Sequence, residues 1–262
     1  MKIRVLGCHG SEQLGGEETG ARQRRTCGFL IDEAVMIDAG TIGAVLTLEE
    51  QRAIRHILLS HLHFDHVQGL PTFGDNLSEN AGQPVSLISI AEVLDGLQAH
   101  IFNDTVYPNF LQLPTPQRPV FAPRVLEPGQ PVRVAGLHVT ATRVNHLVPA
   151  IGFLIREGKT SILYSGDTYA TDEIWRAAAR EPTLKAAFIE TSFPNRMADL
   201  AMASKHLTPA LLEQEFRKIG RPDLPVYLYH MKPQQRREIE REVGQLGLKQ
   251  VAFLEEGQEI TV

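Results

Sequence analysis

The chain has 262 residues, of which 43% are hydrophobic and 22% are charged, a size that suits one globular domain spanning residues 1–262. Its 26 Lys and Arg against 31 Asp and Glu give a net charge of −5, which disfavours binding to extended nucleic acid or to an anionic membrane. Two cysteines are too few for a disulfide framework, and no signal-peptide pattern or membrane-length apolar run is visible. We therefore expect a cytoplasmic protein.

The first third of the chain reads as short strands and helices in alternation. β-Branched and apolar runs predict strands over residues 2–8, 27–32 and 35–39, the last two as a hairpin. Thr47 and Glu50 have capping-box spacing, which predicts a helix to about residue 55, followed by a strand over 56–60. A strand over 84–88 comes next, and Ser89 with Glu92 forms a second capping-box pattern that predicts a helix to about residue 102.

Seven prolines fall between residues 107 and 131, a density that rules out a long helix or a central strand. The aromatic and aliphatic residues among them argue against a solvated linker. We therefore expect an ordered surface excursion over residues 107–131, with no domain boundary.

The remainder is predicted to contain strands over residues 132–135, 138–144, 151–156, 161–165, 186–191, 226–229 and 251–254. Helices are predicted over 171–180, over 233–246, and from Pro209 to residue 219 with Thr208 as the N-cap. Strands in two successive sets, each followed by helices, favour an α/β (α+β) fold built as a four-layer αββα sandwich. An ordinary α/β fold is the alternative on pattern alone.

The segment from His61 to His66, HLHFDH, directly follows the strand predicted over 56–60. Residues two apart in an extended segment share a face, so His61 and His63 can hold one cation while Asp65 and His66 point toward a second. The alternative is a surface loop that happens to be rich in histidine. The position of the HLHFDH segment at the end of an apolar strand favours a ligand site over such a loop.

A two-metal centre needs further ligands, above all a carboxylate that reaches both ions. His146, Asp167 and His230 each stand at or just after the end of a predicted strand. Any of them alone is more often a structural residue, but the dense histidine motif makes a shared metal site the better hypothesis.

In order and spacing, this residue set resembles the metallo-β-lactamase-fold superfamily over nearly the whole chain. The resemblance implies one metal held by His61, His63 and His146, a second held by Asp65, His66 and His230, and Asp167 bridging the two. It places Asp38 at the superfamily's usual acidic position, where it could orient a ligating histidine. A turn-forming Asp before Gly40 is the alternative. Zinc is the default for both divalent ions, although manganese and iron also suit these ligands.

The bridging position carries Asp167 rather than the Cys of a thiolate-type lactamase, which favours a hydroxide held between two metals for in-line attack on phosphorus. Residues 189–195 (IETSFPN), 205–209 (KHLTP), 229–233 (YHMKP) and 100–110 resemble the class II cyclic-nucleotide phosphodiesterases. This resemblance implies hydrolysis of 3′,5′-cyclic nucleotides to 5′-monophosphates, with Asp65 and Asp167 at the reacting centre. It implies that His100 and Asn103 line the base or ribose pocket, the alternative being an ordinary helix C-terminal turn.

His206 lies just before the Thr208 N-cap, where a helix N-terminus favours an anionic phosphate and would lower the pKa of the imidazole. We expect His206 to contact the phosphoryl group or protonate the leaving 3′ oxygen, with Glu190 as its orienting partner. A capping-region His without a catalytic part is the alternative. The basic loop residues Arg22, Arg24 and Arg25 are read as solvated, with phosphate contact as the less favoured interpretation.

Three other functions stay open at this point. A tRNA 3′-end nuclease shares the metal set and a functional His, but the acidic charge balance favours a small-molecule substrate. A thioester hydrolase on the same scaffold is the second alternative, and a non-catalytic metal-binding protein is the third. No membrane partner is expected, and the chain could form a homodimer.

Overall fold

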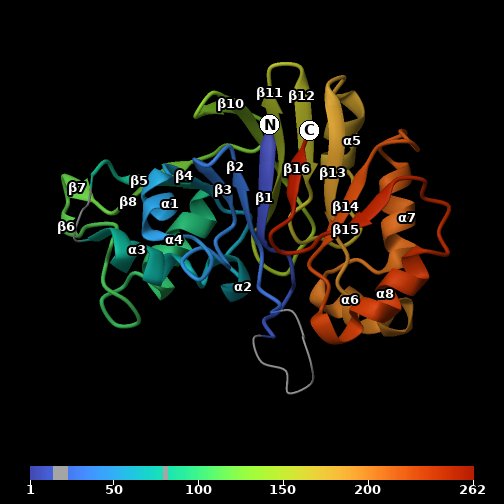
Figure 1. Cartoon of the computed structure of the whole chain (residues 1–262), viewed down its shortest axis with the longest axis horizontal. Helices are drawn as coiled ribbons and strands as arrows, with labels where there is room; N and C mark the ends of the chain where they lie inside the picture. Colours follow the sequence, from blue (N-terminus) through green and yellow to red (C-terminus); the bar gives the residue numbers. More distant parts are fainter. Residues whose placement is uncertain (14–22, 79–81) are drawn as a thin grey trace.

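The computed structural model describes residues 1–13, 23–78 and 82–262, which form four layers (Figure 1). In this part of the chain, two seven-stranded sheets face each other, and helices cover their outer faces. The four-layer αββα sandwich expected from the sequence is confirmed. No helix in the described ranges has the length and apolar character needed to cross a membrane.

The first sheet has the order β16-β1-β2-β3-β4-β5-β8. Its strands are β1 (Lys2–Gly7), β2 (Gly28–Ile31), β3 (Val35–Ile37), β4 (His56–Leu58), β5 (Val85–Ser89), β8 (Phe121–Val125) and β16 (Glu259–Thr261). A separate two-stranded ribbon is formed by β6 (Pro114–Thr115) and β7 (Arg118–Pro119). The helices on this side are α1 (Leu48–Ala53), α2 (Phe64–Val67), α3 (Leu70–Ser78) and α4 (Ala91–His100).

The second sheet has the order β15-β14-β13-β12-β11-β10-β9. Its strands are β9 (Pro131–Val134), β10 (Leu137–Arg143), β11 (Ile151–Glu157), β12 (Thr160–Tyr164), β13 (Leu184–Glu190), β14 (Val226–Tyr229) and β15 (Val251–Phe253). The helices on this side are α5 (Glu173–Arg180), α6 (Ala198–Ser204), α7 (Pro209–Arg217) and α8 (Arg236–Val243). Short 3₁₀ turns over Asn195–Met197 and Pro233–Gln235 precede α6 and α8.

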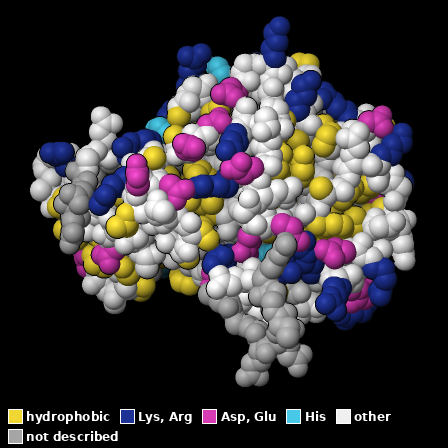
Figure 2. Space-filling view, viewed as in Figure 1, with side chains coloured by type: hydrophobic (Ala, Val, Ile, Leu, Met, Phe, Trp, Pro, Cys, Tyr) yellow, Lys and Arg dark blue, Asp and Glu magenta, His cyan; other side chains and the backbone are white. Residues whose placement is uncertain are grey.

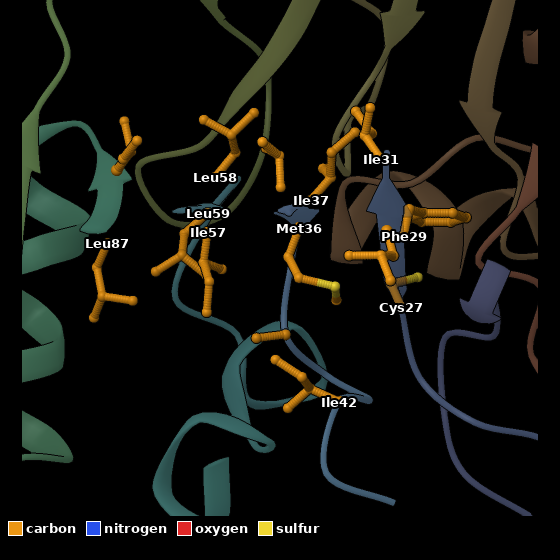
Figure 3. Packing of buried hydrophobic residues seen from close by; sticks show 14 of the residues in the cluster. Cys27, Phe29, Ile31, Met36, Ile37, Ile42, Ile57, Leu58, Leu59 and Leu87 are labelled. Atoms are coloured by element: carbon orange, nitrogen blue, oxygen red, sulfur yellow. The ribbon is translucent and has the colours of Figure 1, made fainter. Parts of the chain in front are cut away.

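Alternating side chains of the first sheet pack into two apolar layers, one on each face of the sheet. Ile37 and Leu58 point to one side of the sheet, whereas Met36 and Ile57 point to the other (Figure 3). Between the sheets, Phe29 makes edge-on ring contacts at 5.5–6.2 Å centroid distance with aromatic residues of three strands of the second sheet, namely Tyr164, Phe188 and Tyr229. Both faces of this sheet are therefore buried, as its apolar runs require.

Several predicted local features are present. Thr47 and Glu50 make the reciprocal bonds of a capping box at the start of α1, and Thr208 caps α7 with Pro209 in its first turn. The hairpin between β2 and β3 turns through Asp32 and Glu33, both in the left-handed region at φ 44° and 62°.

The second predicted capping box is wrong. Ser89 is the last residue of β5, and its buried hydroxyl donates to the carbonyl of Leu59 at 2.7 Å, so it does not cap α4. That helix begins at Ala91 after Ile90, without a side-chain cap. The Ser89 hydroxyl bonds the chain that follows the neighbouring strand β4 and is therefore not available to the helix. A local sequence pattern does not show this partner.

The Pro-rich segment is only partly a surface excursion. Phe110 and Phe121 are buried, and β8 pairs in parallel with β5 as the outermost strand of the first sheet. Proline is tolerated there because an edge strand leaves one row of backbone donors unpaired. The short helices α2, α3 and α6 and the strand β16 were not predicted.

The topology brings the carboxyl ends of six strands to one edge of the sandwich. β3 and β4 are parallel, as are β12, β13 and β14, and β10 runs with them because both β10 and β12 are antiparallel to β11. Residues that follow these strands therefore meet at one end of the molecule.

Candidate metal centre

The histidine motif leaves β4 in an extended conformation and then turns into α2. His63 is the N-cap residue of this short helix, so His61 and His63 precede the turn and Asp65 and His66 lie within it. The other three predicted ligands follow strands of the second sheet: His146 after β10, Asp167 after β12 and His230 directly after β14. All seven residues lie at the same edge.

Left-handed backbone turns redirect the chain at this edge. Gly166, before Asp167, has φ 62°, and His230 itself has φ 68°, a conformation that is strained for a residue with a Cβ. Gly10 passes close to His230, since a Cβ added there would lie 2.6 Å from the His230 carbonyl oxygen. The close approach requires glycine at position 10.

Asp167 lies at the centre of the cluster. One of its oxygens, Oδ2, is 3.0 Å from His230 Nε2, 3.3 Å from His66 Nε2 and 3.7 Å from His61 Nε2. Asp65 Oδ2 lies 3.2 Å from His230 Nε2. The carboxylate of Asp167 therefore reaches both predicted halves of the site.

The other half is formed by three imidazoles. Candidate ligand nitrogens of His61, His63 and His146 all lie within 4.8 Å of one another, and His63 Nδ1 is 3.0 Å from His146 Nε2. His146 Nδ1 faces the Lys205 carbonyl oxygen at 3.0 Å. As a donor to this carbonyl, Nδ1 carries the proton and leaves Nε2 free to bind a cation.

The donor set fits divalent cations. His61 Nε2, His66 Nε2 and Asp167 Oδ1 are buried polar atoms without a hydrogen-bond partner in the described ranges, an arrangement that is costly unless a ligand satisfies them. Burial lowers the pKa of His61 and of His63, and it lowers the pKa of His146 to about 4. These imidazoles are therefore neutral near pH 7, as metal ligation requires.

His66 differs from the other imidazoles. Burial lowers its pKa, but the carboxylates of Asp167 and Asp38 outweigh burial and hold the pKa of His66 well above its usual value. Without a cation, this ring carries a proton between two acidic groups. A bound metal would take the place of the proton on Nε2.

Asp38 lies behind the candidate ligands and bonds to them. Its Oδ1 accepts from the Ser60 amide at 2.8 Å, while its Oδ2 accepts from the hydroxyls of Ser60 and Tyr164 and from His66 Nδ1 at 2.7–2.8 Å. Because the Ser60 hydroxyl donates to Asp38, it accepts from His61 Nδ1, 3.0 Å away. One buried carboxylate thus fixes two imidazoles so that each Nε2 faces the cluster.

Ser192 has the same role for His230. Its hydroxyl donates to Glu190 Oε2 at 3.0 Å and lies 2.8 Å from His230 Nδ1, from which it accepts. Ser60, Tyr164 and Ser192 were not assigned roles from the sequence. The local patterns of Tyr164 and Ser192 do not show these contacts. For Ser60 the one available signal is its position at the end of a predicted strand, directly before His61.

His206 and Glu190 are brought together as predicted. His206 Nδ1 lies 3.0 Å from Glu190 Oε1, and both side chains are buried. The His206 ring stacks on His230 at 5.1 Å and contacts the His146 ring edge-on at 5.1 Å. It therefore lies against both halves of the cluster.

The predicted direction of the pKa of His206 is wrong. Burial lowers it, but the Glu190 carboxylate bonded to Nδ1 and the nearby Asp167 outweigh burial, so the pKa of His206 is raised. The short-range contact with a carboxylate exceeds the field of the helix that begins at Pro209.

Three other predicted groups lie apart from these contacts. The Asn103 amide donates to the Ala99 carbonyl, and its oxygen accepts from the amides of residues 105 and 106, so it closes its own turn. His100 is the exposed last residue of α4. Of the basic loop, Arg22 falls outside the described residues, whereas Arg24 and Arg25 pair with two acidic residues, Glu255 and Glu256.

Both cysteines, Cys8 and Cys27, are buried free thiols. Cys27 lies near the nitrogens of His66 and His230, within 4.8 Å of their candidate ligand atoms. Burial holds its pKa well above the usual range, so it stays a thiol and donates to the His9 carbonyl. A protonated thiol is a poor metal ligand.

Residues 14–231 match the family model described as the beta-lactamase superfamily domain. The chain belongs to this superfamily. The superfamily fold normally holds divalent metals, and its members are typically hydrolases. The His and Asp cluster described above has ligand types that suit such metals.

The fold is also similar to solved structures that share little sequence. Yeast PDE1 has a TM-score of 0.81 at 17% identity, covering 100% of this chain and 99% of that one. The metallo-beta-lactamase fold protein YhfI from Bacillus subtilis has a TM-score of 0.75 at 15% identity, covering 99% of this chain and 98% of that one. The short form of human tRNase Z has a TM-score of 0.67 at 17% identity, covering 100% of this chain and 99% of that one. No curated protein sequence matches the chain.

Proposed function

We propose that the chain is a metal-dependent phosphodiesterase that hydrolyses 3′,5′-cyclic nucleotides to nucleoside 5′-monophosphates. The observation that carries this proposal is the buried Glu190–His206 pair, which lies against a cluster centred on an aspartate oxygen. Phosphodiester cleavage needs a proton for the leaving alkoxide, and this pair can supply it. The fold similarity to yeast PDE1 supports the proposal without fixing the substrate.

Two cations at the cluster, zinc by default, would supply a water of lowered pKa and offset charge on the phosphate. His61, His63 and His146 would hold one, Asp65, His66 and His230 the other, and Asp167 would contact both. Asp38 and Ser192 keep the ligand nitrogens aimed at the cluster.

His206 acts on the leaving group. With Nδ1 held by Glu190, its proton on Nε2 can pass to the 3′ oxygen as the P–O3′ bond breaks. The oxygen of the attacking water bonds to phosphorus, and the proton of that water leaves to solvent. The raised pKa of His206 favours the protonated form that this step requires. Lys205, next in the chain, has no ion-pair partner in the described ranges and adds positive charge near the phosphate.

The test is a metal-reconstituted assay with cyclic AMP, cyclic GMP, bis(p-nitrophenyl) phosphate, a tRNA 3′ precursor and a thioester. We expect cyclic nucleotides to be converted to 5′-monophosphates and Asp167→Ala to abolish turnover. His206→Ala should lower turnover roughly 100-fold or more while leaving the metal content unchanged.

Other outcomes assign other functions. Cleavage of the tRNA precursor with cyclic nucleotides untouched would make the chain a nuclease, and thioester cleavage alone would make it a thioesterase. Metal-loaded protein that leaves every substrate intact would show a non-catalytic metal-binding protein. Equal loss of metal and turnover in His206→Ala would remove the catalytic role of His206.

A further inference from the structure

Large apolar side chains are exposed on three segments that carry or adjoin residues of the cluster. Phe64 is 65% exposed, Leu147 58% and Met202 50%, which places them among the most exposed large hydrophobic residues of the described chain. Isolated exposed hydrophobics are ordinary on a protein surface. These three are notable because each comes from a different segment that also carries a residue of the candidate site.

The segment that carries Leu147 contacts the other two. Phe64 stands between His63 and Asp65 in the chain, and Leu147 directly follows His146, whose ring lies 4.8 Å from that of His63. Met202 lies in α6, whose C-cap residue Lys205 places its carbonyl 3.0 Å from His146 Nδ1. The short helices α2 and α6 lie at the same end of the sandwich (Figure 1).

We propose that Phe64, Leu147 and Met202 form an apolar rim that binds the nucleobase of the substrate. This inference rests on the proposed function. A phosphodiester held at the cluster places the group attached to it on the adjoining surface, to which the segments carrying these three side chains contribute. An aromatic ring and two aliphatic side chains suit the flat apolar faces of a base, and such stacking tolerates different bases.

Charge at the rim fits the same ligand. Lys205 Nζ lies 5.2 Å from the Tyr169 ring centroid, and no carboxylate in the described ranges forms an ion pair with it. On the face drawn in Figure 2, the exposed charges are mixed in sign. A ligand with an anionic phosphate and an apolar base matches a cluster bordered by Lys205 and an apolar rim.

The test compares the binding of adenosine 5′-monophosphate with that of inorganic phosphate by metal-loaded protein, measured by calorimetry. Phosphate reports on the cluster alone, and the difference between the two affinities reports on the rim. We expect Phe64→Ala to weaken nucleotide binding by roughly fivefold or more, as loss of base stacking does, with phosphate affinity and metal content unchanged. Phe64→Trp should keep nucleotide affinity.

Leu48→Ala is the control. Leu48 is also an exposed apolar residue, at 49%, but it lies on α1, which carries no residue of the candidate site. It should change neither affinity. The rim proposal is overturned if Phe64→Ala weakens both ligands equally or neither, or if light scattering shows that Phe64→Ala converts a dimer to a monomer without changing nucleotide affinity. Binding needs no turnover, so a wild-type protein that binds nucleotide through Phe64 but fails to hydrolyse cyclic nucleotides refutes the proposed function alone.

Discussion

Replacement of Asp38 by Asn tests how the cluster is held. Asp38 accepts hydrogen bonds from the Ser60 amide and hydroxyl, the Tyr164 hydroxyl and His66 Nδ1. Asn offers one accepting oxygen, so its NH₂ group must face some of these donors. The backbone is at φ 55°, a conformation that Asn tolerates better than Ala, so Asn isolates the side-chain effect.

The hydroxyls can rotate to accept from the amide, but the imidazole has to change tautomer. His66 would then carry its proton on Nε2, the atom that faces Asp167 at 3.3 Å. A protonated Nε2 cannot bind a cation. We therefore expect Asp38→Asn to weaken metal binding about 10- to 100-fold, and to cost about 1–3 kcal/mol of unfolding free energy in the metal-free protein.

Metal affinity would be measured by competition with a chromophoric chelator, and stability by urea unfolding of the metal-free chain. If Asp38→Asn bound zinc within about twofold of the wild type, the positioning role given to Asp38 would be refuted, whatever its effect on stability.

The raised pKa of His66 predicts that metal binding releases its proton, so that affinity falls by up to about tenfold for each pH unit below that pKa. Calorimetry in two buffers of different ionisation enthalpy measures this proton, and buffer-independent heats would contradict the prediction. Glu215→Gln weakens the acceptor of the buried Trp175 Nε1–H, 2.6 Å away, and should cost about 1–3 kcal/mol in urea unfolding with metal affinity unchanged; weaker zinc binding would oppose this separation. Thr47→Ala removes the cap of α1 and should cost about 1 kcal/mol by the same measurement, whereas an unchanged midpoint would show that the cap contributes nothing.

The sequence was most informative where the residue types and their spacing are typical of one kind of structure, such as a metal site or a helix cap. The HLHFDH segment, with His146, Asp167 and His230 after strands, predicted which side chains meet, because metal ligands are few in kind and stand where strands end. The local caps at Thr47 and Thr208 were equally readable, since their partners lie within one helical turn.

What escaped prediction depends on distant partners. Tyr164 bonds Asp38 across 126 positions, and Ser89 is used by a neighbouring strand rather than by the helix that follows it. The pKa of His206 rises because Glu190 forms a direct hydrogen bond with it. The spacing of the two residues in the sequence does not reveal this contact. Hydroxyl residues and paired charges have many uses, so only the fold selects among them.

The most direct test of the central claim is anomalous diffraction from crystals of the metal-loaded protein, collected at the absorption edge of the metal. We predict two peaks, one bounded by His61, His63 and His146 and the other by Asp65, His66 and His230, with Asp167 in contact with both. A single peak, no peak, or peaks remote from Asp167 would contradict the account.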